Sequence, residues 1–284
     1  MKKSLKIFLG FLFLMGLVVG LQIASIVILS LIFGLDANFT MTNERDVLVF
    51  LFATIGQLLA SLIFVKFILK KNFSYIWLKR EKLLENFSLG FFLGFLQISL
   101  FVILAMIFSY AQVKNINFNR IDLKFFIFLI GFTIQSTSEE FLVRGIFTRY
   151  LFEKMKASYA VLIPALIFSL LHLFNGGYTF LSALNTFLVG IFYGILILAC
   201  KNILLVSGAH SAWNFSMSLI YGLPVSGQVK IEGLIGIESL NVNAMGGIYG
   251  PEESFLVTII ECLSILCAYL YIKKRGFYGK ESSL

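Results

Sequence analysis

Two adjacent carboxylates and an arginine lie in the stretch STSEEFLVRGIF, within one of the most apolar parts of the chain. On a helix, Glu140 and Arg144 are four residues apart, the spacing at which a carboxylate and a guanidinium meet on one face. Glu139 lies about 100° further round the helix, so it cannot share that ion pair equally. We therefore expect Glu140 and Arg144 to neutralise each other and Glu139 to be left as a general base.

Both histidines of the chain lie in short motifs of similar spacing. His210 and Asn214, in GAHSAWNFS, are four residues apart and offer donors that could converge on a developing oxyanion. Phe168 and His172, in FSLLHLFN, repeat the spacing and place an aromatic ring one helical turn from an imidazole. Each of these side chains, taken alone, also has a structural explanation, such as a hydrogen bond between helices.

Ionisable side chains are few in the apolar segments. A charge near the bilayer centre costs roughly 2.5–3.5 kcal/mol on insertion scales, so such residues usually face a bundle interior or a water-filled cavity. Three segments contribute them here, which favours one shared site. Glu261, in VTIIECLSI, is a further case, and we expect it to be structural, because a neighbouring helix can hold a single carboxyl group without any chemical task.

The composition sets the class of protein that must position these residues. Of 284 residues, 59% are hydrophobic and 13% charged, and the mean hydropathy is +0.92, which excludes a water-soluble domain. Apolar runs long enough to cross a hydrocarbon core, which takes about 20 residues, recur along the chain. We expect an all-α fold, a polytopic bundle of about eight transmembrane helices. The predicted spans are 6–34, 47–69, 88–111, 124–150, 158–174, 181–200, 202–221 and 254–272.

The distribution of basic residues predicts an orientation. With the N-terminus inside, the cytoplasmic side collects 17 of the 23 Lys and Arg residues, the other side collects five, and Arg144 lies within a span. The positive-inside rule therefore predicts that both termini are cytoplasmic. The net charge of +8 is explained by this asymmetry, so we expect no nucleic-acid partner.

The depth of the motif residues is a check on a shared site. At about 1.5 Å per residue, Glu139 and His210 fall near the middle of their spans, whereas His172 falls roughly 9 Å outward of the middle of its own. A helix tilt, a kink near Pro164 or a misjudged span end would absorb the offset.

Glycines and loops add three smaller expectations. Pairs of glycines four residues apart predict close approach of helices, because lipid offers no hydrophobic force to join them; they are Gly16 and Gly20, Gly90 and Gly94, and Gly190 and Gly194. The glycine-rich segment 222–253 is expected to be an extended non-cytoplasmic connection that caps the bundle. Cys200, Cys262 and Cys267 show no spacing typical of a disulfide or a metal site and are interpreted as packing residues.

The three motifs together resemble a known family. EEFLVR fits EExxxR, FSLLH fits FxxxH and HSAWN fits HxxxN, in the order of the CPBP family of intramembrane glutamic endopeptidases, the CAAX prenyl protease and bacteriocin-processing group also called Abi. The resemblance covers about 125–216, and GGIYGPEES also looks like the segment before the last helix of bacterial members. Residues 1–120, with three spans, carry no motif signal, and 121–284, with five spans, are interpreted as the catalytic core of the same membrane domain.

The resemblance implies a role for each motif residue. Glu139 and His172 would bind and activate a water, His210 and Asn214 would form the oxyanion site, and Glu140, Arg144 and Phe168 would support them. It also implies a hydrolase that uses no metal and no cofactor. The expected partners are the lipid bilayer, a membrane-associated peptide or protein substrate, and a membrane-protein partner.

Three alternatives stay open. Glu139, His172 and His210 could form a facial metal triad of a metalloprotease, although no HExxH pair is present. The fold could serve a non-catalytic membrane scaffold, immunity or regulatory protein. Intramembrane Glu, His and Arg also make the proton relays of transporters.

The substrate is left between a prenylated CaaX tail and a small bacterial peptide. A composition rich in Lys, Ile, Phe and Asn is typical of AT-rich bacteria, which favours peptide maturation or self-immunity and a location in the bacterial cytoplasmic membrane. The chain ends in GKESSL, which lacks the cysteine of a CaaX box.

Overall fold

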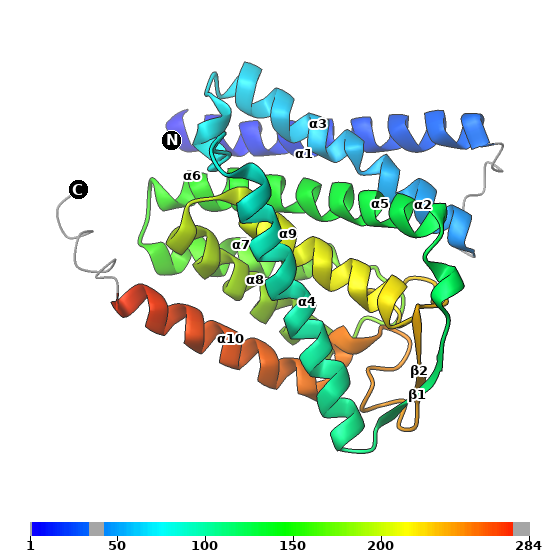
Figure 1. The fold of residues 1–284 in the computed structure, drawn as a ribbon. Coiled ribbons are helices and arrows are strands. Elements are labelled where there is room, and N and C mark those ends of the chain that lie inside the picture. Colours follow the sequence, from blue (N-terminus) through cyan, green and yellow to red (C-terminus); the bar gives the residue numbers. More distant parts are fainter. Residues whose placement is uncertain (1, 34–42, 275–284) are drawn as a thin grey trace.

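Long apolar helices dominate the computed structural model, which describes residues 2–33 and 43–274. Most helices run roughly along one direction, and α4 crosses them obliquely (Figure 1). The elements are α1 (Lys2–Phe33), α2 (Glu44–Ala53), α3 (Ile55–Ile63), η1 (Phe64–Ile68), η2 (Phe73–Ile76), α4 (Leu83–Ile107), β1 (Ala111–Ile116), η3 (Phe118–Arg120), α5 (Leu123–Glu140), η4 (Phe141–Thr148), α6 (Arg149–Phe152), α7 (Ala157–Leu171), α8 (Phe180–Cys200), α9 (Ile203–Phe215), η5 (Ser216–Ile220), β2 (Ile235–Ser239), η6 (Pro251–Glu253) and α10 (Phe255–Lys274).

Seven helical segments of the described chain are long and apolar enough to cross a membrane, so the protein is a multi-pass membrane protein. They correspond to seven of the eight predicted spans. The remaining span, predicted at 158–174, is the shorter helix α7, whose 15 residues end at Leu171. At about 1.5 Å per residue α7 is about 22 Å long, less than the roughly 30 Å of a hydrocarbon core.

Two other spans differ from the predictions. Helix α4 begins at Leu83, five residues before the predicted start at 88; the predicted apolar run started later because Glu85 and Asn86 lie in the first turn. The span predicted at 47–69 is built from α2, α3 and the π-helical η1, and it bends at Thr54, whose hydroxyl donates to the Leu51 carbonyl at 2.6 Å.

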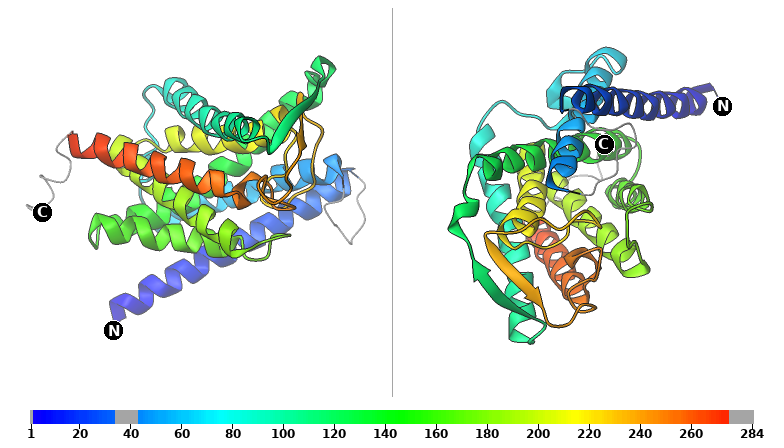
Figure 2. Two further views of the ribbon diagram at one scale, coloured as in Figure 1. Left: turned by 90° about the horizontal axis from the view of Figure 1, so that it is seen from below. Right: turned by 90° about the vertical axis from the view of Figure 1, so that its right-hand side faces the viewer.

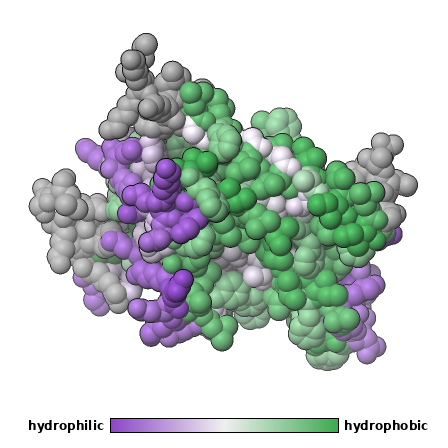
Figure 3. Space-filling model, turned by 90° about the horizontal axis from the view of Figure 1, so that it is seen from above, coloured by the Kyte–Doolittle hydropathy of each residue, from purple (hydrophilic) through white to green (hydrophobic). Residues whose placement is uncertain are grey.

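The two ends of the bundle differ in chemistry. Helix α1 begins and α10 ends at one end, called here the basic end, which also holds the segments 66–82, 149–156 and 200–202 (Figure 1). The opposite end, called the ribbon end, holds the antiparallel pair of β1 and β2, visible in the right-hand view of Figure 2, and the segments 172–179 and 221–254. A broad apolar band separates polar side chains at the two ends (Figure 3).

The ribbon was not predicted from the sequence. Ala111 pairs with Ser239 and Ile116 with Ile235, across more than a hundred residues of intervening chain. Two strands of five and six residues carry too little alternation for a sequence pattern to reveal such a distant pairing.

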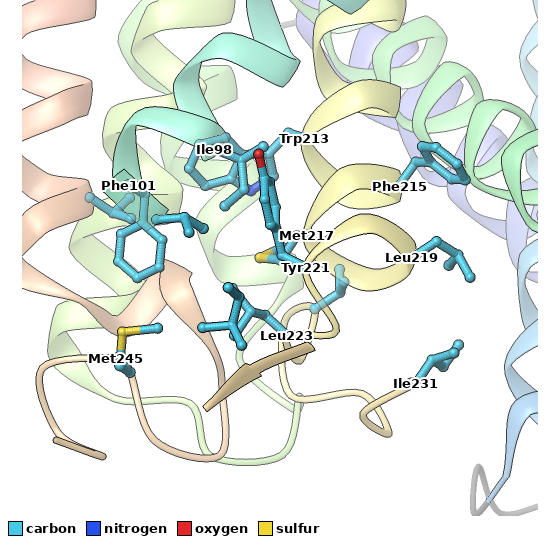
Figure 4. Packing of buried hydrophobic residues seen from close by; sticks show 14 of the residues in the cluster. Ile98, Phe101, Trp213, Phe215, Met217, Leu219, Tyr221, Leu223, Ile231 and Met245 are labelled. Carbon is cyan, nitrogen blue, oxygen red and sulfur yellow. The ribbon is translucent and has the colours of Figure 1, made fainter. Parts of the chain in front are cut away.

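Segment 222–253 packs against one end of the bundle, as predicted for a connection that caps it, but it is folded onto the helices and not extended. Leu223, Ile231 and Met245 are buried in a cluster with α4 and α9, around Phe101 and Trp213 (Figure 4). Burying these apolar side chains at one end of the bundle fixes the segment as part of the fold.

Helices α4 and α9 pack against each other most closely, and glycines make this possible. A Cβ atom at Gly90 would lie 1.8 Å from the Leu205 carbonyl oxygen, and one at Gly94 would lie 1.9 Å from that of Ala209. Gly190 and Gly194 similarly face Ala165 and Val161 of α7. The predicted close approach is thus confirmed for these two glycine pairs. It was wrong for Gly16 and Gly20, which face open space.

Gly94→Ala should destabilise the protein, because the added methyl group has to push α9 away at Ala209, next to His210. Overpacking of this kind typically costs about 1–3 kcal/mol. The matched control is Gly20→Ala, which should be neutral or stabilise the helix by up to about 1 kcal/mol. Thermal unfolding of the two variants in detergent measures the difference, and equal Tm values would contradict the close packing of α4 on α9.

Candidate active site

The Glu140 side chain lies at the centre of a buried ion-pair network. Its Oε1 accepts from Arg144 Nη1 at 2.9 Å and from His210 Nδ1 at 2.9 Å. The carboxylate can only accept, so the imidazole donates from Nδ1 and has Nε2 on its other side. Arg144 and Glu140 are 1% and 0% exposed. The predicted pairing of Glu140 with Arg144 is therefore present, and a third partner from α9 joins it.

Glu139 occupies a different environment from its neighbour, as its position on the helix predicts. Its side chain is 21% exposed, and its Oε2 lies 3.7 Å from His210 Nε2. Gln135, one turn earlier on α5, donates from Nε2 to Glu139 Oε1. Glu139 Oε2 is itself buried, and no hydrogen-bond donor of the described chain reaches it; the residue as a whole lines the cavity.

Two aromatic rings, those of Phe168 and Tyr193, contact the imidazole and guanidinium groups. The Phe168 ring lies 4.7 Å from that of His172 and 6.1 Å from that of His210, and the Arg144 guanidinium sits 4.5 Å from its centroid. The ring of Tyr193 on α8 also lies against Arg144 and His210, at 5.3 and 5.7 Å. Phe168 thus contacts both histidine motifs, a wider role than its one-turn spacing from His172 indicated.

His172 lies where α7 ends, not within a longer helix. Its Nδ1 is 2.8 Å from the Phe168 carbonyl oxygen, which accepts a hydrogen bond from the ring. Because α7 is short, its end reaches less far along the bundle than a full span would, and His172 lines the same cavity as Glu139 and His210. The offset in depth expected from the sequence therefore does not keep His172 out of the shared cavity.

Asn214 is held by residues of α5 that the sequence analysis did not single out. Its Nδ2 donates to Gln135 Oε1 at 3.1 Å and lies 3.4 Å from Ser136 Oγ. The Gln135 carboxamide therefore bridges Glu139 and Asn214. Its position four residues before Glu139 is the signal that could have identified it, since residues at that spacing face each other on a helix.

Most of these groups border one cavity of about 440 Å³. Among its lining residues are Glu139, His172, His210, Asn214 and Gln135, with Phe168 and Tyr193. Apolar side chains from α1, η4, α8 and α9 complete the walls, including Val18, Leu142, Val189 and Trp213. The structure thus brings together the residues of all three motifs, except that Glu140 and Arg144 lie behind the cavity wall.

Arg144 lies in η4, where the helix of α5 widens into π-helical turns directly after Glu140. Such turns inside helices are frequent at functional sites. The helix α9 also continues as the π-helical η5 after Phe215, beyond Asn214.

Glu261 on α10 is 1% exposed, and no donor of the described chain reaches either of its carboxyl oxygens. It borders a separate cavity of about 20 Å³, which has room for about one water molecule. Glu261 does not line the large cavity, although the two cavities share the wall residues Thr186, Val189, Trp213 and Glu252. Its structural role stays a prediction.

The side chains that could bind a metal ion are spread over the structure. Within the described ranges 2–33 and 43–274, no three His, Cys, Asp or Glu side chains are grouped closely enough to hold a metal ion. Glu139 and His210 approach each other, and His172 lies elsewhere on the wall of the same cavity.

Comparison with known proteins identifies part of the chain. Residues 121–216 match the model of the Rce1-like family, described as type II CAAX prenyl endopeptidase Rce1-like. This range contains every residue of the three motifs and coincides with the resemblance inferred from them. No curated protein and no solved structure matches the chain.

Proposed function

We propose, from the Rce1-like character of residues 121–216, that the protein is an intramembrane endopeptidase that uses a water activated by Glu139. The observation that carries the proposal is the convergence of three motifs on one cavity inside an apolar bundle. Ionisable groups are costly there, and they are arranged with one carboxylate neutralised and the other accessible.

In the proposed reaction, Glu139 takes a proton from a water that His172 helps to position. The water oxygen attacks the carbonyl carbon of a peptide bond, and the carbonyl oxygen gains the negative charge. His210 Nε2–H, in the imidazolium form, and the Asn214 amide donate hydrogen bonds to this oxyanion. Glu139 then returns the proton to the leaving amine as the C–N bond breaks. The products are a carboxylic acid and an amine, and no covalent enzyme intermediate forms.

Glu140, Arg144 and Gln135 act as positioning residues in this scheme. Glu140 receives the His210 Nδ1–H, which aims Nε2 at the cavity, and Arg144 compensates the charge of Glu140. Gln135 fixes Glu139 and Asn214 relative to each other. The substrate is proposed to be a bacterial peptide or a membrane-associated protein, in a bacterial cytoplasmic membrane.

The experiment that tests the function compares new protein N-termini in membranes of host cells that carry wild type, Glu139→Gln or no copy of the gene. Matched expression of the two versions is the control. Termini that appear only with wild type would support a protease and name its substrate. If no terminus depends on Glu139 and both versions rescue the deletion equally, the protein is a non-catalytic scaffold.

Chelators separate the proposed mechanism from the metalloprotease alternative. Because the water is activated by side chains alone, EDTA or 1,10-phenanthroline should leave the cleavage rate unchanged. The measurement is the rate on a purified substrate before and after treatment, with a known zinc protease as control. Loss of activity that zinc restores would favour a metal held by Glu139, His172 and His210.

A further inference from the structure

The large cavity reaches one end of the bundle only. Its wall includes Phe174, Asn175 and Gly176, which follow α7, and Val225 to Gln228 with Glu252 of segment 221–254. These residues belong to the ribbon end. None of the lining residues comes from the basic-end segments 66–82, 149–156, 200–202 or 273–274 of the described chain. A substrate backbone therefore reaches Glu139 from the ribbon end or from the bilayer beside it.

The ribbon-end wall of the cavity is built from specific contacts. Glu252 Oε2 accepts hydrogen bonds from the Ser226 backbone N–H at 2.7 Å and from Ser226 Oγ at 2.6 Å. Asn175 Nδ2 donates to the Ser226 carbonyl at 3.1 Å, which ties the segment after α7 to this loop. Gly227 lies so close to Gly176 that a Cβ atom there would be 2.0 Å from the Gly176 carbonyl oxygen. The mouth is therefore a fixed part of the fold.

The two ends differ in charge as well as in their distance from the cavity mouth. The segments that the structure gathers at the basic end carry most of the lysines and arginines, and the ribbon end carries five. The ribbon end has more acidic than basic residues in the described chain; its acidic residues are Glu44, Asp46, Asp122, Glu232, Glu238, Glu252 and Glu253. The positive-inside rule assigns the basic end to the cytoplasm.

We propose that the active-site cavity opens on the non-cytoplasmic face of the membrane, so that the substrate is an already exported polypeptide or the outer part of a membrane protein. This inference rests on the proposed function. A prenylated CaaX tail of a cytoplasmic protein would lie at the basic end, across the bundle from the mouth. The chain therefore combines an Rce1-like segment with a site that such a tail does not reach.

Cysteine accessibility tests which face the mouth occupies. Ser239→Cys and Val242→Cys place thiols at exposed positions of the ribbon end, Gln228→Cys places one at the cavity mouth, and Ser74→Cys is the matched control at the basic end. Intact cells are treated with a membrane-impermeant maleimide, and the unmodified chain, with its own three cysteines, gives the background. Label on the ribbon-end thiols in intact cells, and on Ser74→Cys only after permeabilisation, is the expected pattern.

The reverse pattern, with Ser74→Cys labelled from outside and both ribbon-end thiols protected, would overturn the inference. Two exposed ribbon-end positions keep the test valid if one variant fails to accumulate. Labelling does not depend on catalysis, so it assigns the face even if the proposed function is wrong. In the comparison of N-termini, absence of Glu139-dependent termini would reject the protease, whereas such termini in cytoplasmic segments would reject only the non-cytoplasmic substrate.

Discussion

Glu139→Gln is expected to reduce cleavage by about 10²–10⁴-fold while the protein stays folded, since this is the range that general acid–base catalysis contributes. The amide keeps the size of the side chain and can still pair with Gln135, but it cannot take a proton from water. The 21% exposure of Glu139 and its place on the cavity wall make a folding defect small. The measurement is turnover of a peptide that spans a cleavage site found in host membranes, with Tm in detergent as the folding readout.

The matched control for this variant is Glu238→Gln. Glu238 is exposed on β2, where it accepts a hydrogen bond from Gln112, and it does not line the cavity. The control makes the same chemical change and should leave turnover and Tm unchanged. Turnover by Glu139→Gln within a few-fold of wild type would remove Glu139 from the mechanism and leave His210 or His172 as the base.

Arg144→Ala is expected to destabilise the protein by about 3–5 kcal/mol, the range measured when one partner of a buried ion pair is removed. Among the described residues, Glu140 would keep His210 alone as a partner for a fully buried carboxylate. The rings of Phe168 and Tyr193 would also lose their contacts with the guanidinium, and the shorter side chain leaves a cavity. Activity should fall together with Tm, because His210 is positioned through Glu140.

A second Glu and Arg pair at the same spacing provides the control. Arg149 and Glu153 are 3.0 Å apart, but their side chains are 27% and 40% exposed. Exposed pairs contribute about 0–1 kcal/mol, and the contacts of Arg149 with Tyr75 and Trp77 add a similar amount, so Arg149→Ala should cost much less than Arg144→Ala.

The double variant Arg144→Ala/Glu140→Gln separates a stranded charge from lost packing. Neutralising Glu140 should recover part of the stability that Arg144→Ala loses, as a double-mutant cycle would show. If both single variants at Arg144 and Arg149 unfold at the same temperature, the Glu140 pair is not buried as described.

Much of the fold followed from local sequence patterns. Runs of about 20 apolar residues predict spans because only a helix satisfies its backbone in lipid, and seven of the eight predicted spans are long apolar helices. Contacts within one helix were equally predictable. The spacing of Glu140 and Arg144 predicted their ion pair, and the position of Glu139 predicted its separate environment. The order of the three motifs was enough to identify the Rce1-like segment.

Contacts between helices were decided by the tertiary structure alone. Spacing could not show that His210 bonds to Glu140, that Gln135 joins Glu139 to Asn214, or that Glu252 helps to build the mouth of the cavity. Sequence periodicity defines which side chains share a face of one helix, but the rotation and depth of each helix relative to its neighbours depend on distant contacts. Here the deciding contacts are the close approach at Gly90 and Gly94 and the burial of segment 222–253 against the bundle. The short length of α7 also sets where His172 lies.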